Sequence, residues 1–180
     1  MKRAIFFPGT GETGESVWFP YLAGELTRMQ YGVKTIVYPN PDKPNVEELV
    51  EIATRENYDE ETLLIGHSAG VALILAVLER LDIKVKKVIL VAGYIKALSA
   101  YEDANLVLKT QYDWEKIKNN AGEVVIINSV NDPWGCDDRQ GRAIFDHLGG
   151  TLIINHEGHM GSVTYNQPYT EFPLILKLII

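Results

Sequence analysis

Apolar residues gather along the chain in six short β-rich runs. The runs lie at residues Arg3–Phe7, Val33–Tyr38, Thr62–Gly66, Lys87–Ala92, Glu123–Asn128 and Thr151–Asn155. Most of them are continuous rather than alternating with polar residues, which is typical of parallel strands that are buried on both faces. The pattern therefore predicts six parallel strands.

Helix-like segments separate these runs. We expect helices at about Ser16–Gln30, Val46–Thr54, Ala69–Leu81, Asp113–Asn119, Asp137–Leu148 and Pro168–Ile180. The alternation of strands and helices predicts an α/β fold, a three-layer doubly wound sheet with the strand order 2-1-3-4-5-6. The least regular region, residues 93–112, is a long connection of the kind that often builds a binding site. No linker of disordered composition divides the chain, so we expect residues 1–180 to form a single domain.

Composition and charge narrow the classes of partner. Of the 180 residues, 46% are hydrophobic and 23% are charged, as in ordinary globular proteins. The net charge is −7 and no run of Lys or Arg occurs, which argues against a nucleic acid or an anionic membrane as partner. The longest apolar run, Val71–Leu78, is too short for a membrane span, and the apolar start of the chain is too short for a signal peptide. With Cys136 as the single cysteine, we expect a cytoplasmic protein without metal or disulfide chemistry.

The third strand runs into the motif Gly66-His67-Ser68-Ala69-Gly70, a G-x-S-x-G sequence that opens an apolar helix. This strand–turn–helix context is the one in which a nucleophilic serine is found, because a tight turn between small residues lifts the hydroxyl out of the sheet. The helix N-terminus beneath it adds backbone N–H groups and the positive end of a dipole. The motif predicts that Ser68 is a nucleophile.

A serine nucleophile needs an orienting acid and a base, which follow it in that order in this kind of fold. Asp132 comes directly after the fifth strand, where the acid is expected, although an Asp before Pro133 also suits a turn. Asp137 and Asp138 are the alternatives. They better fit the first turn of the next helix, where carboxylates favour the dipole.

Four histidines are candidates for the base. His159 lies on a short loop beyond the last strand, beside Gly158, and such a loop lets an imidazole reach over the sheet edge toward the serine. His156 directly ends the strand and is the second choice. His67 is expected to be packed inside the turn, and His147 lies near a helix C-terminus, where a cation suits the dipole.

The stretch after the first strand, Pro8-Gly-Thr-Gly-Glu-Thr-Gly-Glu-Ser16, resembles two nucleotide-binding patterns. The dinucleotide pattern also needs an acidic residue at the end of the second strand, and that strand ends in Tyr38-Pro39. The phosphate-loop pattern needs a Lys where Glu15 stands. Glu12 and Glu15 would each repel a phosphate, so we expect no nucleotide.

The same loop has another use at the point where the chain reverses direction between strands 1 and 3, since ligands bind there. The loop should face Ser68. Its glycines let the backbone come close, so the N–H of Thr10 and that of Ala69 are the expected donors of an oxyanion hole. The candidates for the substrate pocket are Gly9, Gly11, His67, Trp18, Tyr94 and Trp134. The aromatic residues among them could equally pack in the core.

Ser68 in GHSAG, Asp132 in NDPW and His159 in EGHM resemble, in type and order, the triad of small serine hydrolases of the retinoblastoma-binding-protein-9 type. That group belongs to the α/β-hydrolase superfamily. The resemblance covers nearly the whole chain and implies a minimal α/β-hydrolase fold without a lid domain, with serine hydrolase activity. Two features depart from it. The first loop has Pro8-Gly9 where the family often has His-Gly, and an L-x-C-x-E motif is absent, so no retinoblastoma-type partner is implied.

The resulting hypothesis is a serine hydrolase, a carboxylesterase that cleaves small-molecule acyl substrates through an acyl-enzyme and needs no cofactor. The alternative from another class is a non-catalytic protein-interaction module on a hydrolase scaffold. For that alternative, the apolar tail Phe172–Ile180 could form a homodimer face, although it also fits a helix that packs on the sheet and begins near Pro173.

Overall fold

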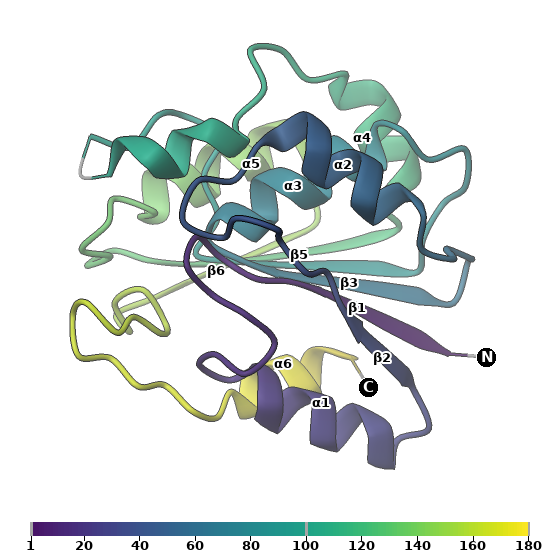
Figure 1. Cartoon of the computed structure of the whole chain (residues 1–180), viewed down its shortest axis with the longest axis horizontal. Coiled ribbons are helices and arrows are strands. Elements are labelled where there is room, and N and C mark those ends of the chain that lie inside the picture. The colour runs from purple at the N-terminus through teal and green to yellow at the C-terminus, as the bar shows by residue number, and fades with distance from the viewer. Residues whose placement is uncertain (1, 100, 180) are drawn as a thin grey trace.

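A computed structural model describes residues 2–99 and 101–179 (Figure 1). Six strands form one parallel sheet in the order β2-β1-β3-β4-β5-β6. They are β1 (Arg3–Phe7), β2 (Gly32–Thr35), β3 (Thr62–His67), β4 (Lys87–Val91), β5 (Glu123–Ser129) and β6 (Thr151–Asn155). The expected number, direction and order of strands are confirmed. All strands end at the same edge of the sheet, where the loops that follow them meet.

Helices cover both faces of the sheet and make three layers (Figure 1). α1 and α6 lie on one face, and α2, α3, α4 and α5 lie on the other. Their bounds are α1 (Phe19–Arg28), α2 (Val46–Thr54), α3 (Ala69–Leu78), α4 (Trp114–Asn120), α5 (Asp138–Leu148) and α6 (Pro173–Ile179). α3 is buried along its whole length, which explains why its sequence is apolar on every side rather than on one stripe.

Helix starts differ from the sequence prediction for steric reasons. α1 begins at Phe19 rather than Ser16, because Val17 has φ 45°, outside the helical region. α6 begins at Pro173 rather than Pro168, because Tyr169 has φ 39° and Pro173 suits the first helical position. Ile180 lies outside the described residues.

β2 is shorter than predicted and ends at Thr35. One further ladder bond follows, from the Ile36 N–H to the Phe6 carbonyl at 2.9 Å, and the chain then leaves the sheet before Pro39. A proline has no N–H to donate to a neighbouring strand. The chain therefore turns away from the sheet here and leads toward the edge at which the strands end, where Asp42 lies.

The connection over residues 93–112 is more ordered than its sequence suggests. It contains a short 3₁₀ helix, η1 (Glu102–Val107). The Asn105 side chain accepts the Leu98 N–H at 2.8 Å and donates to the Leu98 carbonyl at 2.9 Å, which closes the segment on itself. The wholly buried Tyr94 donates its hydroxyl to the Ala104 carbonyl. These bonds hold the segment in place, and Leu98 and Tyr101 form part of the wall of the cavity described below.

The apolar C-terminal segment packs against the core. Phe172, Ile175 and Ile179 are buried, and α6 lies beside α1 on the lower face of the sheet (Figure 1). Among the described residues, no helix has both the length and the apolar character needed to cross a membrane.

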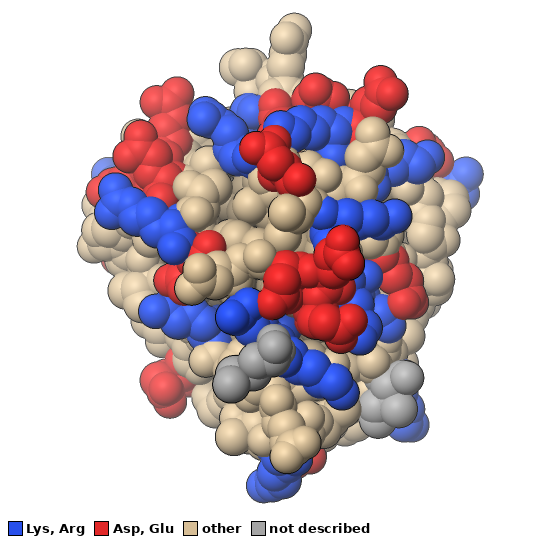
Figure 2. Space-filling view, turned by 90° about the vertical axis from the view of Figure 1, so that its right-hand side faces the viewer, with Lys and Arg blue, Asp and Glu red and all other residues tan. Residues whose placement is uncertain are grey.

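The opposite edge of the sheet, where the strands begin, carries mixed charge. Figure 2 shows acidic and basic side chains interspersed over this face. Ion pairs join residues near the strand starts, for example Lys86 with Glu61 at 2.7 Å and Lys87 with Glu123 at 3.1 Å. The view contains no extended patch of one sign of the kind that nucleic-acid binding uses.

Candidate active site

Ser68 occupies a sharp turn between β3 and α3. Its backbone has φ 53° and ψ −119°, a left-handed conformation that L-residues avoid and that marks stored strain. The turn requires glycine at Gly70, where an added Cβ would come within 1.9 Å of the Phe7 carbonyl oxygen. The result is a partly exposed serine at the ligand edge of the sheet, above the N-terminus of α3.

Asp132 and His159 meet at the same edge from the loops after β5 and β6. His159 Nδ1 lies 2.7 Å from Asp132 Oδ2. The other oxygen, Oδ1, accepts the Trp134 N–H at 2.9 Å, and the Asp132 side chain is fully buried. With each of its oxygens hydrogen-bonded, the carboxylate is fixed in place and fixes the His159 ring in turn.

The loop that carries His159 is tied to the rest of the molecule through its backbone. The His159 N–H donates to Gln167 Oε1 at 2.9 Å, and Trp18 Nε1 donates to the Met160 carbonyl at 3.0 Å. Gly158 has φ 61°, and an added Cβ there would meet the Gln167 side chain at 2.1 Å. These contacts place the imidazole with its second nitrogen free of Asp132 and at the cavity.

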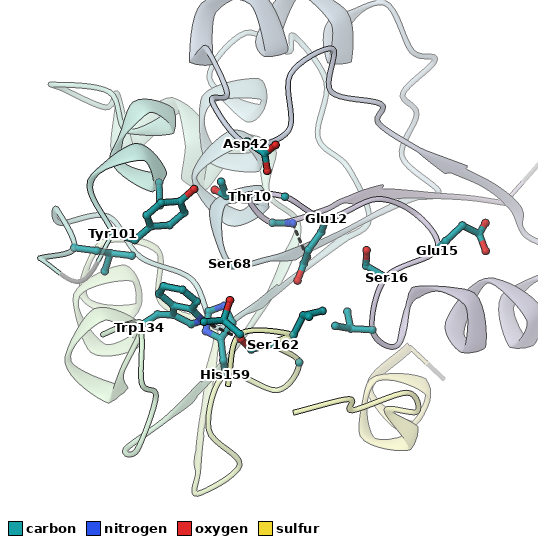
Figure 3. Close-up of a pocket in the computed structure, with 18 residues that line it drawn as sticks. Thr10, Glu12, Glu15, Ser16, Asp42, Ser68, Tyr101, Trp134, His159 and Ser162 are labelled. Carbon is teal, nitrogen blue, oxygen red and sulfur yellow. Dashed lines mark hydrogen bonds between the residues drawn. The ribbon is translucent and has the colours of Figure 1, made fainter. Parts of the chain in front are cut away.

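Ser68 and His159 both line a cavity of about 630 Å³ (Figure 3). Figure 3 shows His159 and Trp134 on one side of it and Thr10 and Glu12 on the other. The full lining is Gly9, Thr10, Gly11, Glu12, Glu15, Ser16, Val17, Asp42, Ser68, Leu98, Tyr101, Ala104, Trp134, His159, Gly161, Ser162, Val163 and Thr164. This volume is in the range of small-molecule sites.

The first loop abuts the serine as the topology predicted. A Cβ added at Gly9 would lie 3.1 Å from the Ser68 Cβ, so a side chain there would press on Ser68. Among the described residues, the N–H groups of Thr10 and Ala69 donate to no protein acceptor, whereas the Gly9 N–H donates to Glu12 Oε2 at 2.7 Å. Two backbone donors on either side of Ser68 are therefore available to a ligand.

The family model described as Serine hydrolase matches residues 4–179 of this chain. The chain belongs to the serine hydrolase family. The match extends over nearly the whole sequence and includes each of the loops that meet at the cavity.

Two relatives show the extent of the likeness. The chain is 27% identical over 185 residues to YdeN of Bacillus subtilis (strain 168), covering 99% of this chain and 94% of that protein. It is 24% identical over 172 residues to Serine hydrolase RBBP9 of Rattus norvegicus, covering 92% and 90% of the two chains. The crystal structure of the B. subtilis ydeN gene product superposes with a TM-score of 0.90 at 23% identity, over 99% of this chain and 97% of that one. The fold is thus the α/β-hydrolase fold.

Within this serine hydrolase, burial sets the protonation state of His159. Burial of the ring lowers its pKa below the ordinary value, and the nearby His67 cation lowers it further, while the hydrogen bond to Asp132 opposes both effects. The imidazole is therefore neutral at neutral pH, the form that can accept a proton.

The cavity of this serine hydrolase has a second carboxylate–histidine pair, which the sequence did not predict. His67 Nδ1 lies 2.9 Å from Glu12 Oε1 and 3.0 Å from Oε2, and its Nε2 lies 2.8 Å from the His159 carbonyl oxygen. Burial alone would lower the pKa of His67, but the Glu12 carboxylate raises it above the ordinary value. Burial likewise opposes ionisation of Glu12, yet His67 holds the pKa of that carboxyl below its usual range. The two groups therefore form a buried ion pair.

Only part of the predicted pocket lines the cavity. Gly9, Gly11 and Trp134 do, as does Thr10, but Trp18, His67 and Tyr94 are wholly buried and belong to the core behind it. For these three residues the alternative of packing in the core holds, because their rings fill the space between the sheet and the loops. Their polar atoms are bonded to backbone or to Glu12.

The alternative candidates for the acid and the base lie elsewhere in this serine hydrolase. Asp137 is the N-cap of α5 and accepts the Arg139 N–H at 3.0 Å, and Asp138 lies in the first turn, where both favour the helix dipole. His156 is exposed. His147 stacks on the Trp114 ring at 4.0 Å, near the end of α5.

The sulfur of Cys136 lies close to Asp132 and His159. Ligand atoms of Asp132, Cys136 and His159 lie within 4.8 Å of one another. The 2.7 Å bond between Asp132 and His159 already uses one ligand atom of each, and burial raises the pKa of the Cys136 thiol well above its usual value. The three residues are therefore better suited to the hydrogen bond between Asp132 and His159 than to binding a metal ion, which needs deprotonated ligands.

Proposed function

We propose that this serine hydrolase is a carboxylesterase that cleaves small acyl substrates through an acyl-enzyme on Ser68. One observation carries the proposal. The strained Ser68 turn and the Asp132–His159 pair, separated by more than sixty residues in the sequence, converge on one cavity. This arrangement supports the assignment of a Ser-His-Asp triad, a constellation that is recognised by geometry rather than by sequence position.

Acylation begins with proton transfer from Ser68 to His159. Asp132 holds the hydrogen on Nδ1, so that the lone pair of Nε2 faces the cavity and can take the Ser68 proton. The Ser68 oxygen then bonds to the substrate carbonyl carbon, and the imidazolium returns the proton to the leaving alcohol as the ester bond breaks. Asp132 stabilises the transient cation without becoming protonated itself.

The tetrahedral intermediate carries a negative oxygen that needs donors. We assign this role to the N–H groups of Ala69 and Thr10, which flank Ser68 and have no protein acceptor among the described residues. Each such donor contributes about 3–4 kcal/mol to transition-state stabilisation. A water molecule then gives a proton to His159 as its oxygen bonds to the acyl carbon. The bond between that carbon and the Ser68 oxygen breaks, His159 returns the proton to Ser68, and the acid is released.

The cavity lining favours a neutral substrate with an apolar group. Leu98, Tyr101 and Trp134 form one wall, and the Tyr101 and Trp134 rings lie 5.7 Å apart. Besides Glu12, which is paired with His67, the described lining contains the carboxylates of Glu15 and Asp42 and neither Lys nor Arg, so an anionic substrate would be repelled. We therefore propose uncharged esters with a short acyl or aromatic group as substrates.

A fluorophosphonate probe tests the proposal. We expect covalent labelling of the wild-type protein at Ser68, loss of labelling in Ser68→Ala, and strong reduction in His159→Ala, measured by intact-protein and peptide mass spectrometry. Ser16→Ala is the matched control, because Ser16 lines the same cavity but does not lie on the turn. Folded wild-type protein that stays unlabelled after long exposure would point instead to an interaction module with an unused triad.

A further inference from the structure

Glu12, at the cavity wall, and His67, behind that wall, form a largely buried ion pair next to the proposed catalytic groups. The His67 side chain is fully buried, and that of Glu12 is 15% exposed. The His67 and His159 rings lie 4.8 Å apart between centroids, and the Trp18 ring meets His67 edge-on at 5.7 Å. Neither Glu12 nor His67 takes part in the proposed acylation or deacylation, and burying a pair of charges costs desolvation energy.

The acceptors on both sides of the His67 ring favour a doubly protonated imidazole, whose charge Glu12 balances. His67 Nδ1 faces a carboxylate and Nε2 faces a carbonyl, and both are acceptors. A neutral imidazole has one N–H and could satisfy only one of them. With two N–H groups the ring donates to both, and Glu12 balances the resulting charge.

The pair joins three segments that are distant in sequence. Glu12 accepts the Gly9 N–H at 2.7 Å, which shapes the backbone immediately before Thr10. His67 is bonded directly to Ser68 through the peptide chain. Its Nε2 holds the backbone carbonyl of His159, 92 residues away, at 2.8 Å. Each segment supplies one element of the proposed reaction: an oxyanion donor, the nucleophile and the base.

We propose that Glu12 and His67 are positioning residues, a buried ion pair that keeps the base and the oxyanion loop in register with Ser68. The inference rests on the proposed function of Ser68 and His159. It assigns the pair no contact with the reacting atoms, since His67 lies behind the cavity wall and the Glu12 oxygens are engaged by Gly9 and His67.

The pair also sets the electrostatic surroundings of His159. The groups that face the His159 ring are Asp132 and Cys136 from the loop after β5, His67 from the end of β3, and Glu12 from the first loop. The His67 cation lowers the pKa of His159 by more than the Glu12 anion raises it. Removing both charges together should therefore raise the pKa of the base.

Two substitutions of Glu12 separate geometry from charge. In Glu12→Gln the amide oxygen can accept the Gly9 N–H while the amide nitrogen donates to Nδ1 of a neutral His67, whose Nε2–H still holds the His159 carbonyl. One bond to Gly9, one to Nδ1 of His67 and the bond to the His159 carbonyl persist, and both charges disappear. In Glu12→Ala the carboxylate bonds are lost.

Kinetics of these variants test the positioning role. We expect Glu12→Ala to lose about 100-fold in kcat, the effect of misplacing a reacting group by about 1 Å, with little change in KM. Glu12→Gln should restore most of that loss and move the acid limb of kcat/KM to higher pH, which a purely structural role would not do. Glu25→Gln, whose partly exposed carboxylate pairs with Arg28 on α1 and does not line the cavity, and His147→Gln are the controls. An unchanged kcat in folded Glu12→Ala would overturn the proposal.

Substitutions of His67 provide a second route if Glu12→Ala does not fold. Gln at position 67 can retain the bond to the His159 carbonyl, whereas Asn places its amide nearer the position of Nδ1 and loses that bond. We expect kcat to fall further in His67→Asn than in His67→Gln. Equal kcat values in the two variants would contradict the assigned link to His159.

A measurement without turnover keeps this inference distinct from the proposed function. With ¹⁵N-labelled histidine, NMR should show His67 protonated on both nitrogens at pH 7 and neutral in Glu12→Gln. A singly protonated His67 in the wild-type protein would overturn the ion pair even if esters are cleaved. Absence of hydrolysis with a doubly protonated His67 would instead overturn the proposed function and leave the pair intact.

Discussion

Two carboxylate–histidine pairs lie side by side in this molecule, and their chemistry is opposite. Asp132–His159 and Glu12–His67 have similar contact distances, 2.7 and 2.9 Å, and both imidazoles are buried. The pKa of His159 is lowered and that of His67 is raised. The difference lies in what the second nitrogen meets. His67 Nε2 faces a backbone carbonyl, which favours a proton on that nitrogen, while His159 Nε2 makes no hydrogen bond among the described residues.

A carboxylate beside a histidine does not by itself define a base. In the Asp132–His159 pair the imidazole is neutral and keeps a lone pair that can accept a proton. In the Glu12–His67 pair both imidazole nitrogens are hydrogen-bonded and the ring is positively charged. The positive charge of His67 in turn lowers the pKa of His159. One pair is thus suited to proton transfer and the other to holding backbone segments in place.

Replacing the base should produce the largest difference between the pairs. We expect His159→Ala to lower kcat by roughly 10⁶-fold, the size found when a triad base is removed. His67→Gln should retain far more activity, because it leaves the Ser68–His159–Asp132 set complete. Ester hydrolysis under saturating substrate measures both. Comparable losses in the two variants would show that the pairs do not differ in role.

Replacing the acids should give the next largest difference. Asp132→Asn can no longer hold the required tautomer of His159, and we expect kcat to fall by about 10⁴-fold. Glu12→Gln, which is also a carboxylate-to-amide change, should cost far less. A near-normal rate in Asp132→Asn would redirect attention to Asp137 or Asp138.

The free energy of unfolding should depend more strongly on the buried Glu12–His67 pair than on an exposed ion pair. His67→Ala leaves the Glu12 carboxylate buried without its partner, and we expect the free energy of unfolding to fall by about 3–5 kcal/mol. Asp146→Ala breaks the exposed Arg142–Asp146 pair on α5 and should cost about 0.3–0.5 kcal/mol. Urea unfolding followed by circular dichroism measures both. Equal effects would contradict the buried ion pair.

The smallest expected effect is a pH dependence of stability. The pKa of His67 is raised on folding, so its contribution is complete below about pH 6.5 and is lost as the pH rises through the folded value. The pKa of Glu12 is lowered, so its contribution is complete above about pH 4.5 and is lost as the pH falls through the folded value. The unfolding free energy of the wild-type protein should therefore exceed that of Glu12→Gln most between about pH 4.5 and 6.5. A difference that does not vary with pH would argue against the charges.

Much of the fold was predictable because its signals are local. Continuous apolar runs marked the six strands, and the alternation with helices gave the sheet order that the structure shows. The boundaries failed where single residues adopt left-handed backbone conformations, at Val17 before α1 and Tyr169 before α6. Nothing in residue type predicts a positive φ at a Val or a Tyr, because such conformations persist only when the surrounding structure imposes them.

The candidate site was predictable in part. Ser68, Asp132 and His159 follow three strands whose ends must meet at one edge, so their convergence follows from topology. Trp18 and Tyr94 were expected at the same edge but lie beneath it. An aromatic residue near a strand end can face the ligand or the core, and only packing against neighbouring segments decides between them.

The sequence by itself determined the order of the elements and the turn at Ser68, since both depend on periodicity and on the small size of Gly66 and Gly70. Tertiary structure alone decided the partner of Glu12. In the sequence Glu12 is a charge in a glycine-rich loop that argues against a phosphate. In the fold it lies against His67, 55 residues away, because β1 and β3 are neighbours and end at the same level. No spacing rule links residues across such a distance, and desolvation of both groups then fixes their charges.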